Sequence, residues 1–331
     1  MVLFTPQKGI YLNECASCVG PLEGKGPLGE YFDFCFDDEI IEEESYEKAE
    51  AKFAKTAFET LLKKANKKES EIELIFGGDL MNQCTATSHA LKDNPSGYIG
   101  LYGACSTFVL EAINASSAIA SNWANNAVFI SGSHFATAER QFRTPLEYGG
   151  QRPPTAQVTV TGYCAALMSN NKSSVQIKNC LAGRIVDSGL SDITDMGAVM
   201  APAAADTLKS FLELTNTSPD DYDLIVTGDL GARGNELCKD ILKSQGIDLK
   251  ENFKDCGMMI FDPIKQDVHC GGSGCGCSAS VFGGYLFKRL KNKEIKKMLL
   301  MGTGALMSPL TVFQKESIAG ICHLVSMEGV D

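Results

Sequence analysis

The segment Gly103–Phe108, Gly-Ala-Cys-Ser-Thr-Phe, holds the cysteine whose setting best suits chemistry. An apolar run over residues 98–102 precedes it and predicts a buried strand, and small residues over 108–123 predict a buried helix after it. We therefore expect Cys105 at a strand-to-helix turn, beside free backbone N–H groups and the positive end of a helix dipole. Such a turn lowers the pKa of a thiol and can bind an anion.

A purely structural role is the competing interpretation for Cys105. The chain contains 13 cysteines, and a free cysteine packs as a small apolar group. The strand–turn–helix context distinguishes Cys105 from the other cysteines. That context favours a role in a site, but it does not by itself make the thiol a nucleophile.

A basic cluster follows another predicted strand, at the end where ligands collect in doubly wound α/β folds. Its members are His134, Arg140 and Arg143. The two arginines are three residues apart, so they would share one face of a helical turn. Their guanidinium groups could hold two carboxylates. Equally, they could be structural arginines that form bridges through Glu139 or Glu147.

The third candidate segment is a glycine-rich turn that follows His269 and contains Ser273. Its glycines would let the backbone approach a ligand closely. Cysteines 270, 275 and 277 lack the Cys-x₂-Cys spacing of structural zinc sites, so we predict no metal here. The turn also lacks the Lys-Ser/Thr ending of a phosphate-binding loop. His269 could reach the same cavity as Cys105.

The chain contains an internal repeat. The segment Glu73–Leu80 resembles Asp223–Leu230, and each is typical of a buried strand that runs into a Gly-Asp turn. Each follows a helical pattern. The repeat predicts two α/β halves, residues 1–172 and 173–331, each with a mostly parallel sheet covered by helices. The join at Asn170–Ser173 is too short for a flexible tether, so we expect one packed interface.

Bulk properties restrict the class of protein. A net charge of −11 over 331 residues argues against binding nucleic acid, which needs a basic surface. The odd number of cysteines argues against a disulfide scaffold and indicates a reducing compartment. We expect no signal peptide, because no basic region precedes an apolar stretch, and no span of the roughly 20 apolar residues that cross a bilayer. The acidic run Asp37–Glu44 predicts a solvated surface loop.

Five strings resemble the stage V sporulation protein AD family. They are Gly-Ala-Cys-Ser-Thr at 103–107, Ala-Thr-Ala-Glu-Arg-Gln-Phe-Arg at 136–143, Glu-Tyr-Gly-Gly-Gln at 147–151, Gly-Gly-Ser-Gly-Cys-Gly-Cys-Ser at 271–278 and Gly-Thr-Gly-Ala-Leu-Met-Ser-Pro at 302–309. More broadly, the duplicated halves, the Cys105 turn and the His269-x-x-Gly-Ser-Gly turn resemble the thiolase and ketoacyl synthase superfamily. This resemblance implies a layered α-β-α-β-α core and a homodimer.

The resemblance also implies a function. The family is understood to bind dipicolinic acid, pyridine-2,6-dicarboxylate, in the cavity that matches the old active site. It works with membrane-embedded stage V subunits that move the acid and calcium into the forespore, at the inner spore membrane. No cofactor is implied. The ligand-binding candidates are then Cys105, His134, Arg140, Arg143, His269 and Ser273.

Two departures from the superfamily favour binding over catalysis. A thiolase carries a second cysteine in a loop that here reads Met301–Ala305, without cysteine. A ketoacyl synthase carries a histidine where this chain reads Thr227–Arg233. The alternative is a thiolase-type acyltransferase with Cys105 as nucleophile and His269 as its partner. A third interpretation is an assembly subunit whose cavity is vestigial.

Overall fold

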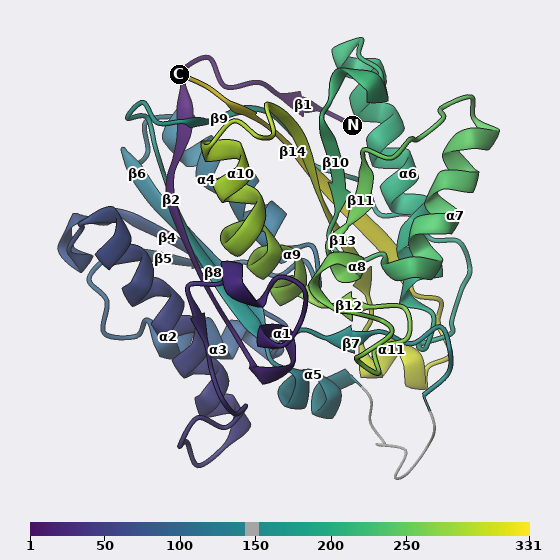
Figure 1. The fold of residues 1–331 in the computed structure, drawn as a ribbon, viewed down its shortest axis with the longest axis horizontal. Coiled ribbons are helices and arrows are strands. Elements are labelled where there is room, and N and C mark those ends of the chain that lie inside the picture. The colour runs from purple at the N-terminus through teal and green to yellow at the C-terminus, as the bar shows by residue number, and fades with distance from the viewer. Residues whose placement is uncertain (143–151) are drawn as a thin grey trace.

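The computed structural model describes residues 1–142 and 152–331. Within them, two halves repeat one order of strands (Figure 1). The strands of the first half are β2 (Ile10–Val19), β4 (Leu74–Asp79), β5 (Gly97–Gly100), β6 (Asn126–Ser133) and β8 (Gly162–Ser169). Those of the second half are β9 (Val175–Leu181), β10 (Leu224–Thr227), β11 (Phe253–Asp255), β13 (Lys297–Leu306) and β14 (Ala319–Gly329).

The spatial order of the strands shows the duplication directly. The first half runs β5-β4-β6-β8-β2, the second runs β11-β10-β13-β14-β9, and β2 adjoins β9 where the halves meet. In each half the first three strands pair in parallel and the last two pair antiparallel. The predicted mostly parallel halves are thus confirmed in fold. Their status as separate domains, 1–172 and 173–331, stays a prediction.

Helices form three layers around the two halves of this continuous sheet. The first half is covered on its outer face by α2 (Tyr46–Ala65) and α3 (Thr85–Ala90), and the second by α6 (Met196–Thr215) and α7 (Gly231–Ser244). The central layer holds α4 (Thr107–Ala120), α9 (Cys275–Val281), the π-helical η5 (Phe282–Leu286) and α10 (Phe287–Lys291). This is the α-β-α-β-α arrangement that the resemblance implied.

Shorter elements connect these layers. They are β1 (Leu3–Phe4), α1 (Pro21–Gly24), η1 (Gly29–Tyr31), β3 (Phe34–Cys35), η2 (Glu69–Glu71), η3 (Asn82–Cys84), α5 (Phe135–Phe142), β7 (Val158–Thr159), η4 (Pro219–Asp221), α8 (Cys256–Ile260), β12 (Gly272–Ser273) and α11 (Pro309–Phe313). Two of them matter for the site: α5 follows β6, and β12 pairs with β7 to fix the glycine-rich turn.

Equivalent helices of the two halves begin and end in the same way. The N-cap of α2 is Ser45, whose hydroxyl accepts a hydrogen bond from the Lys48 N–H, and the N-cap of α6 is Asp195, which accepts from Ala198. Both helices are 20 residues long and end at an asparagine in the left-handed conformation, Asn66 or Asn216. Local capping therefore fixes the same helix length twice.

Aromatic rings fill the central layer and hold the halves together. The Phe108 ring of α4 lies 5.2 Å from Phe129 of β6 and 5.6 Å from Phe282 of η5. All three side chains are buried. Because α4 packs against strands from both halves of the sheet, the helix that begins beside Cys105 is anchored in both halves.

The apolar run before Cys105 does not form the buried strand that we predicted. Its strand, β5, lies at the end of the sheet order, with β4 as its neighbour. Tyr98 is 37% exposed and Tyr102, just after the strand, is 45% exposed. An edge strand lacks a second neighbour to cover it, so its aromatic side chains reach the surface.

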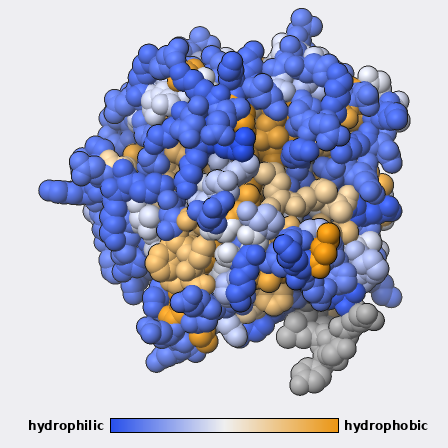
Figure 2. Space-filling model, viewed as in Figure 1, coloured by the Kyte–Doolittle hydropathy of each residue, from blue (hydrophilic) through white to orange (hydrophobic). Residues whose placement is uncertain are grey.

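The surface carries both charged and apolar side chains. Figure 2 shows a face that is largely hydrophilic, with apolar patches gathered near its middle. In residues 1–142 and 152–331, no helix combines the length and the apolar character needed to cross a membrane. All 13 cysteines are unbridged.

Candidate functional site

Cys105 lies at the turn between β5 and α4, as predicted. Three hydrogen bonds shape this turn. The Ser106 hydroxyl donates to the Gly103 carbonyl at 2.6 Å, the Thr107 hydroxyl donates to the Ala104 carbonyl at 2.6 Å, and the Gly103 N–H donates to the Thr107 hydroxyl at 3.1 Å. Ala104 adopts a positive φ of 52°, which turns the chain sharply into the helix. Cys105 is left half-buried.

A buried carboxyl group, Asp229, lies beside the Cys105 thiol. Asp229 follows β10 and has no exposed surface. One carboxyl oxygen accepts from the Thr303 hydroxyl at 2.7 Å, and the other accepts from the Ser273 hydroxyl at 3.1 Å and the Gly274 N–H at 2.9 Å. The thiol lies close enough to the same carboxyl for the two groups to interact electrostatically. Asp229 thus joins segments from both halves at one point.

The electrostatics at Cys105 are opposite to those that we predicted. Burial, and after it the charge of Asp229, raises the pKa of the Cys105 thiol well above its usual range. Hydrogen bonds from Gly274 and Ser273 oppose this shift but do not outweigh it. The prediction of a lowered thiol pKa is therefore wrong. The group presented here is an S–H, not a thiolate.

The pKa of Asp229 itself is raised by its burial, while hydrogen bonds from Thr303, Gly274 and Ser273 act against the shift. Its main chain is held as well: the Asp229 N–H donates to the Thr303 hydroxyl at 3.1 Å, and the Asp229 carbonyl accepts from Gln157 at 2.8 Å. The side chain is therefore fixed from several directions.

The glycine-rich turn lies next to this cluster and supplies Ser273. Gly274 adopts a φ of 93°, and a Cβ there would meet the Ser133 hydroxyl at 2.8 Å. The turn is tied to the first half where the Gly276 N–H donates to the Ser133 hydroxyl at 3.1 Å. The absence of side chains at these positions lets the turn approach β6 closely.

His134 is committed to contacts within the first half. Its Nε2 lies 2.8 Å from the Glu39 carbonyl, and its Nδ1 accepts from the Ala136 N–H at 3.1 Å. Its ring also lies against Tyr46 and Phe53. Burial lowers its pKa, so the ring is neutral and its Nε2 donates to the carbonyl. In this arrangement neither ring nitrogen is available to a ligand.

Of the two predicted arginines, only Arg140 lies within the described residues. Arg140 lies on α5, is half-exposed, and forms an ion pair with Glu47 of α2. That partner is neither of the glutamates considered from the sequence. Arg143 and Glu147 lie outside the described residues, and so does the string at 147–151.

His269 sits in an exposed turn before β12. Its φ is 49°, and its Nε2 lies 3.5 Å from an Asp267 carboxyl oxygen. The nearby thiols point to separate carbonyls: Cys270 to Pro154, Cys275 to Gly132 and Cys277 to Gly228. No group of three or more metal-binding side chains gathers anywhere in the described ranges.

The structure therefore brings together Cys105 and Ser273 through Asp229, which we did not predict. His134 and Arg140 face α2 and its preceding loop instead. The sequence did carry one signal for Asp229. The internal repeat aligns it with Asp79, and a carboxylate retained after a buried strand in both copies invites attention.

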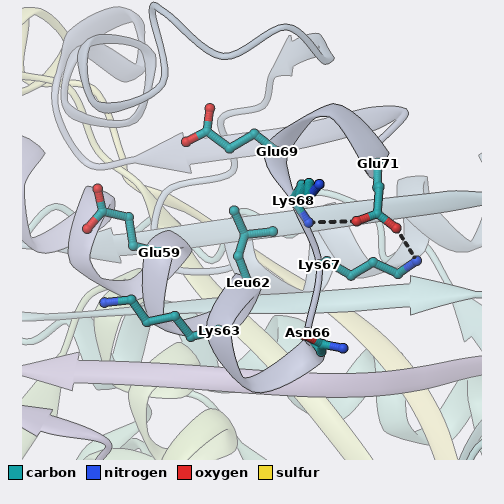
Figure 3. A pocket seen from close by; sticks show the side chains of 8 residues that line it. All are labelled: Glu59, Leu62, Lys63, Asn66, Lys67, Lys68, Glu69 and Glu71. Carbon is teal, nitrogen blue, oxygen red and sulfur yellow. Dashed lines mark hydrogen bonds and ion pairs between the residues drawn. The ribbon is translucent and has the colours of Figure 1, made fainter.

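A surface hollow of about 530 Å³ lies away from these residues, where α2 turns towards β4 (Figure 3). Two of its lining residues, Lys67 and Glu71, form an ion pair of 2.9 Å. It is lined by Glu59, Leu62, Lys63, Asn66, Lys67, Lys68, Glu69 and Glu71. None of the predicted site residues lines it.

Comparisons with known proteins agree with this architecture. A model of the stage V sporulation protein AD (SpoVAD) family matches residues 3–328. Stage V sporulation protein AD of Bacillus subtilis (strain 168) is 41% identical over 319 residues, covering 96% of this chain and 94% of that protein.

Solved structures resemble the chain in fold. One is a variant of OleA from Xanthomonas campestris, with a TM-score of 0.62, 14% identity, and coverage of 99% of this chain and 100% of that one. Another is 3-oxoacyl-[acyl-carrier-protein] synthase III from Aquifex aeolicus VF5, with a TM-score of 0.56, 16% identity, and coverage of 98% and 99%. At these identities the likeness establishes the fold alone.

Proposed function

The chain belongs to the stage V sporulation protein AD family, and from this premise we propose that it binds dipicolinic acid without transforming it. The observation that carries the non-catalytic part is that the Cys105 thiol is held near a buried carboxyl, Asp229. A condensing enzyme needs a nucleophilic sulfur and a group that activates it. Here burial, and after it the charge of the nearby Asp229 carboxyl, raises the thiol pKa.

The ligand is proposed to lie on the exposed side of Cys105. Asp229 already fills the inner side, and a dianion placed there would meet a like charge. Cys105 and Ser273 would contribute S–H and O–H donors. Arg140 and Arg143 would supply positive charge, with Arg140 exchanging its ion pair with Glu47 for a ligand carboxylate. His269, whose ring is partly exposed, is a better candidate than His134 for a further donor.

We further propose that the chain acts as a soluble subunit of the sporulation channel complex. In that role it would associate with membrane-embedded stage V subunits at the inner spore membrane, which move dipicolinate and calcium into the forespore. A homodimer is part of the proposal. Within the described residues, β5 has one neighbouring strand, and a second copy could pair with the backbone groups on its other side.

Titration calorimetry with dipicolinate tests the binding proposal. Arg140→Ala and Ser273→Ala should each weaken binding, and the loss at Arg140 should be about tenfold to a hundredfold, as for a charge-assisted hydrogen bond. Pyridine-2-carboxylate, which lacks one carboxylate, should bind more weakly. Arg184→Ala is the matched control, because Arg184 is also an exposed arginine paired with a carboxylate, Asp206. Absence of binding by the native chain would contradict the proposal, as would equal binding by Arg140→Ala.

Intact-mass spectrometry with acyl-coenzyme A tests the alternative. An acyltransferase forms a thioester at Cys105 and releases coenzyme A, so the chain gains the mass of the acyl group. We expect no such adduct. An adduct that disappears in Cys105→Ser would contradict the non-catalytic proposal.

A further inference from the structure

The two aspartates of the internal repeat occupy equivalent places but are bound by different parts of the molecule. Asp79 ends β4, and Asp229 comes just after β10. The Asp79 carboxyl accepts from the Met81 N–H at 3.0 Å, from the Thr87 N–H at 2.9 Å and from the Thr87 hydroxyl at 2.8 Å. These partners lie within eight residues along the chain. Asp79 therefore stabilises the turn that follows its own strand.

The turn after β10 is stabilised by another aspartate, so Asp229 is not needed there. Asp255, at the end of β11, accepts from the Leu230 N–H at 2.8 Å and from the Gly231 N–H at 3.0 Å. It also accepts from the Thr227 hydroxyl at 2.7 Å. These bonds hold both ends of the turn in the second half. The carboxyl of Asp229 is left to contact more distant segments.

Three donors surround the Asp229 carboxyl, and all of them come from segments far along the chain. One oxygen accepts from the Thr303 hydroxyl at 2.7 Å, and the other accepts from the Ser273 hydroxyl at 3.1 Å and the Gly274 N–H at 2.9 Å. Because the Thr303 oxygen accepts from the Asp229 N–H at 3.1 Å, its own proton remains for the carboxyl. A carboxyl group that accepts three hydrogen bonds on its two oxygens is bound as the carboxylate of a ligand would be.

The donors are held in place by contacts that do not involve the carboxyl. The Ser273 carbonyl accepts from the Val160 N–H at 2.9 Å, and the neighbouring Gly272 carbonyl accepts from Gln157 at 2.8 Å. Thr303 lies within β13, which pairs with β10 and β14. Ser273 is half-buried, so the surface lies close to these donors. Removing the carboxyl would therefore leave a fixed set of donors that a small anion can reach.

We propose that Thr303, Ser273 and Gly274 form a carboxylate-binding position that the chain fills with its own Asp229. Asp229 is then a specificity-determining residue, because no carboxylate of a ligand can enter this position while the Asp229 carboxyl occupies the three donors. The inference deepens the proposed function, since it names the residue that confines a dicarboxylate to the exposed side of Cys105. It rests on that function only in the identity of the ligand.

An ordinary structural crosslink is the rival explanation. In that case Asp229 connects β10, β13 and the glycine-rich turn, and its loss weakens the fold in a way that no added anion repairs. The two explanations differ in one measurable respect. A carboxylate-binding position emptied of its side chain accepts a free carboxylate, and a broken crosslink does not.

The test uses formate, because Asp229→Ala removes a carboxyl group of the same size. Thermal unfolding is followed at increasing formate concentration, with chloride at equal ionic strength as the reference. Formate that binds only the folded chain raises the thermal midpoint of Asp229→Ala, by about 5 °C at about 100 times its dissociation constant. Calorimetry should detect formate binding to Asp229→Ala and none to the native chain, whose position is filled.

Two variants provide matched controls. Asp229→Asn fills the same space with an amide and should bind no formate. Asp187→Ala removes an exposed carboxyl that also accepts from a hydroxyl and an N–H, those of Ser317 at 2.6 Å and Gly189 at 2.9 Å. Water competes for those two donors, so formate should not stabilise this variant.

An Asp229→Ala chain that gains no stability from formate would overturn the proposal, as would an equal gain in Asp187→Ala. If Asp229→Ala does not fold in buffer, formate-dependent refolding replaces the thermal midpoint, and a chain that stays unfolded at every formate concentration also overturns the proposal. Dipicolinate is not used in any of these measurements. If the chain does not bind dipicolinate, the proposed function fails while the formate result stands.

Discussion

Replacing Glu23 by glutamine should remove a large pH dependence of stability. Glu23 lies on α1 and is 1% exposed. One carboxyl oxygen accepts from the Thr161 N–H at 3.0 Å, and the other has no hydrogen-bond partner among the described residues. Burial raises its pKa from 4.5 to about 8, and the negative charge of Glu39 adds to the shift.

The sign follows from linkage. Because the pKa of Glu23 is higher in the folded state, its contribution to stability is fully present below about pH 4.5 and is lost as the pH rises through about 8. Each pKa unit corresponds to about 1.4 kcal/mol, so the free energy of unfolding should fall by about 3–4 kcal/mol between pH 5 and pH 8 through this group alone. Glutamine does not titrate and can still accept from Thr161.

Thermal midpoints at pH 5 and pH 8 provide the assay. For a chain of this size, 1 kcal/mol corresponds to about 2 °C in the thermal midpoint. The fall in the midpoint from pH 5 to pH 8 should therefore be about 6 °C smaller in Glu23→Gln than in the native chain. Other titrating groups contribute equally to both proteins and cancel in this difference. Glu30→Gln, at an exposed glutamate in η1, should behave like the native chain. If the midpoint falls by the same amount in the native chain and in Glu23→Gln, the Glu23 carboxyl is ionised and solvated, and the reasoning fails.

Two further predictions concern the site and the proposed dimer. Thr303→Val removes the hydroxyl that donates to Asp229 at 2.7 Å and accepts from its N–H at 3.1 Å, so the free energy of unfolding measured by chemical denaturation should fall by about 2–4 kcal/mol. Thr5→Val, at the surface, should lower it little. If both variants are equally stable, the hydrogen bonds around Asp229 do not stabilise the fold. Ile99→Lys places a charge on the edge strand β5 and should convert a dimer to a monomer in light scattering, and a dimer that survives the change would place the interface elsewhere.

Features set by local pattern were predictable from the sequence. Apolar spacing, a capping residue and a following turn define α2 and its equivalent α6, because helix formation depends on neighbours within a few residues. The repeated Gly-Asp turn marked β4 and β10 as equivalent strands. Two copies of one pattern then implied the two α/β halves.

The direction in which side chains point was not predictable in the same way. His134 and Arg140 do follow the carboxyl end of β6, but their partners are Glu39 and Glu47 from the region of α2. Likewise, β5 is as apolar as a buried strand, and only the strand order shows that it lies at an edge. These outcomes depend on which distant elements pack nearby.

The sequence by itself determined the duplicated architecture, the helix that begins beside Cys105 and the family to which the chain belongs, because repeated local patterns and motif strings survive without coordinates. Only the tertiary structure decided the chemistry of the cysteine. A helix N-terminus favours a thiolate over a short range, but the sulfur is packed into the fold, and a buried carboxyl from the other half of the chain interacts with it electrostatically. Burial of the sulfur and, after it, that nearby charge outweigh the turn, and no local pattern records either.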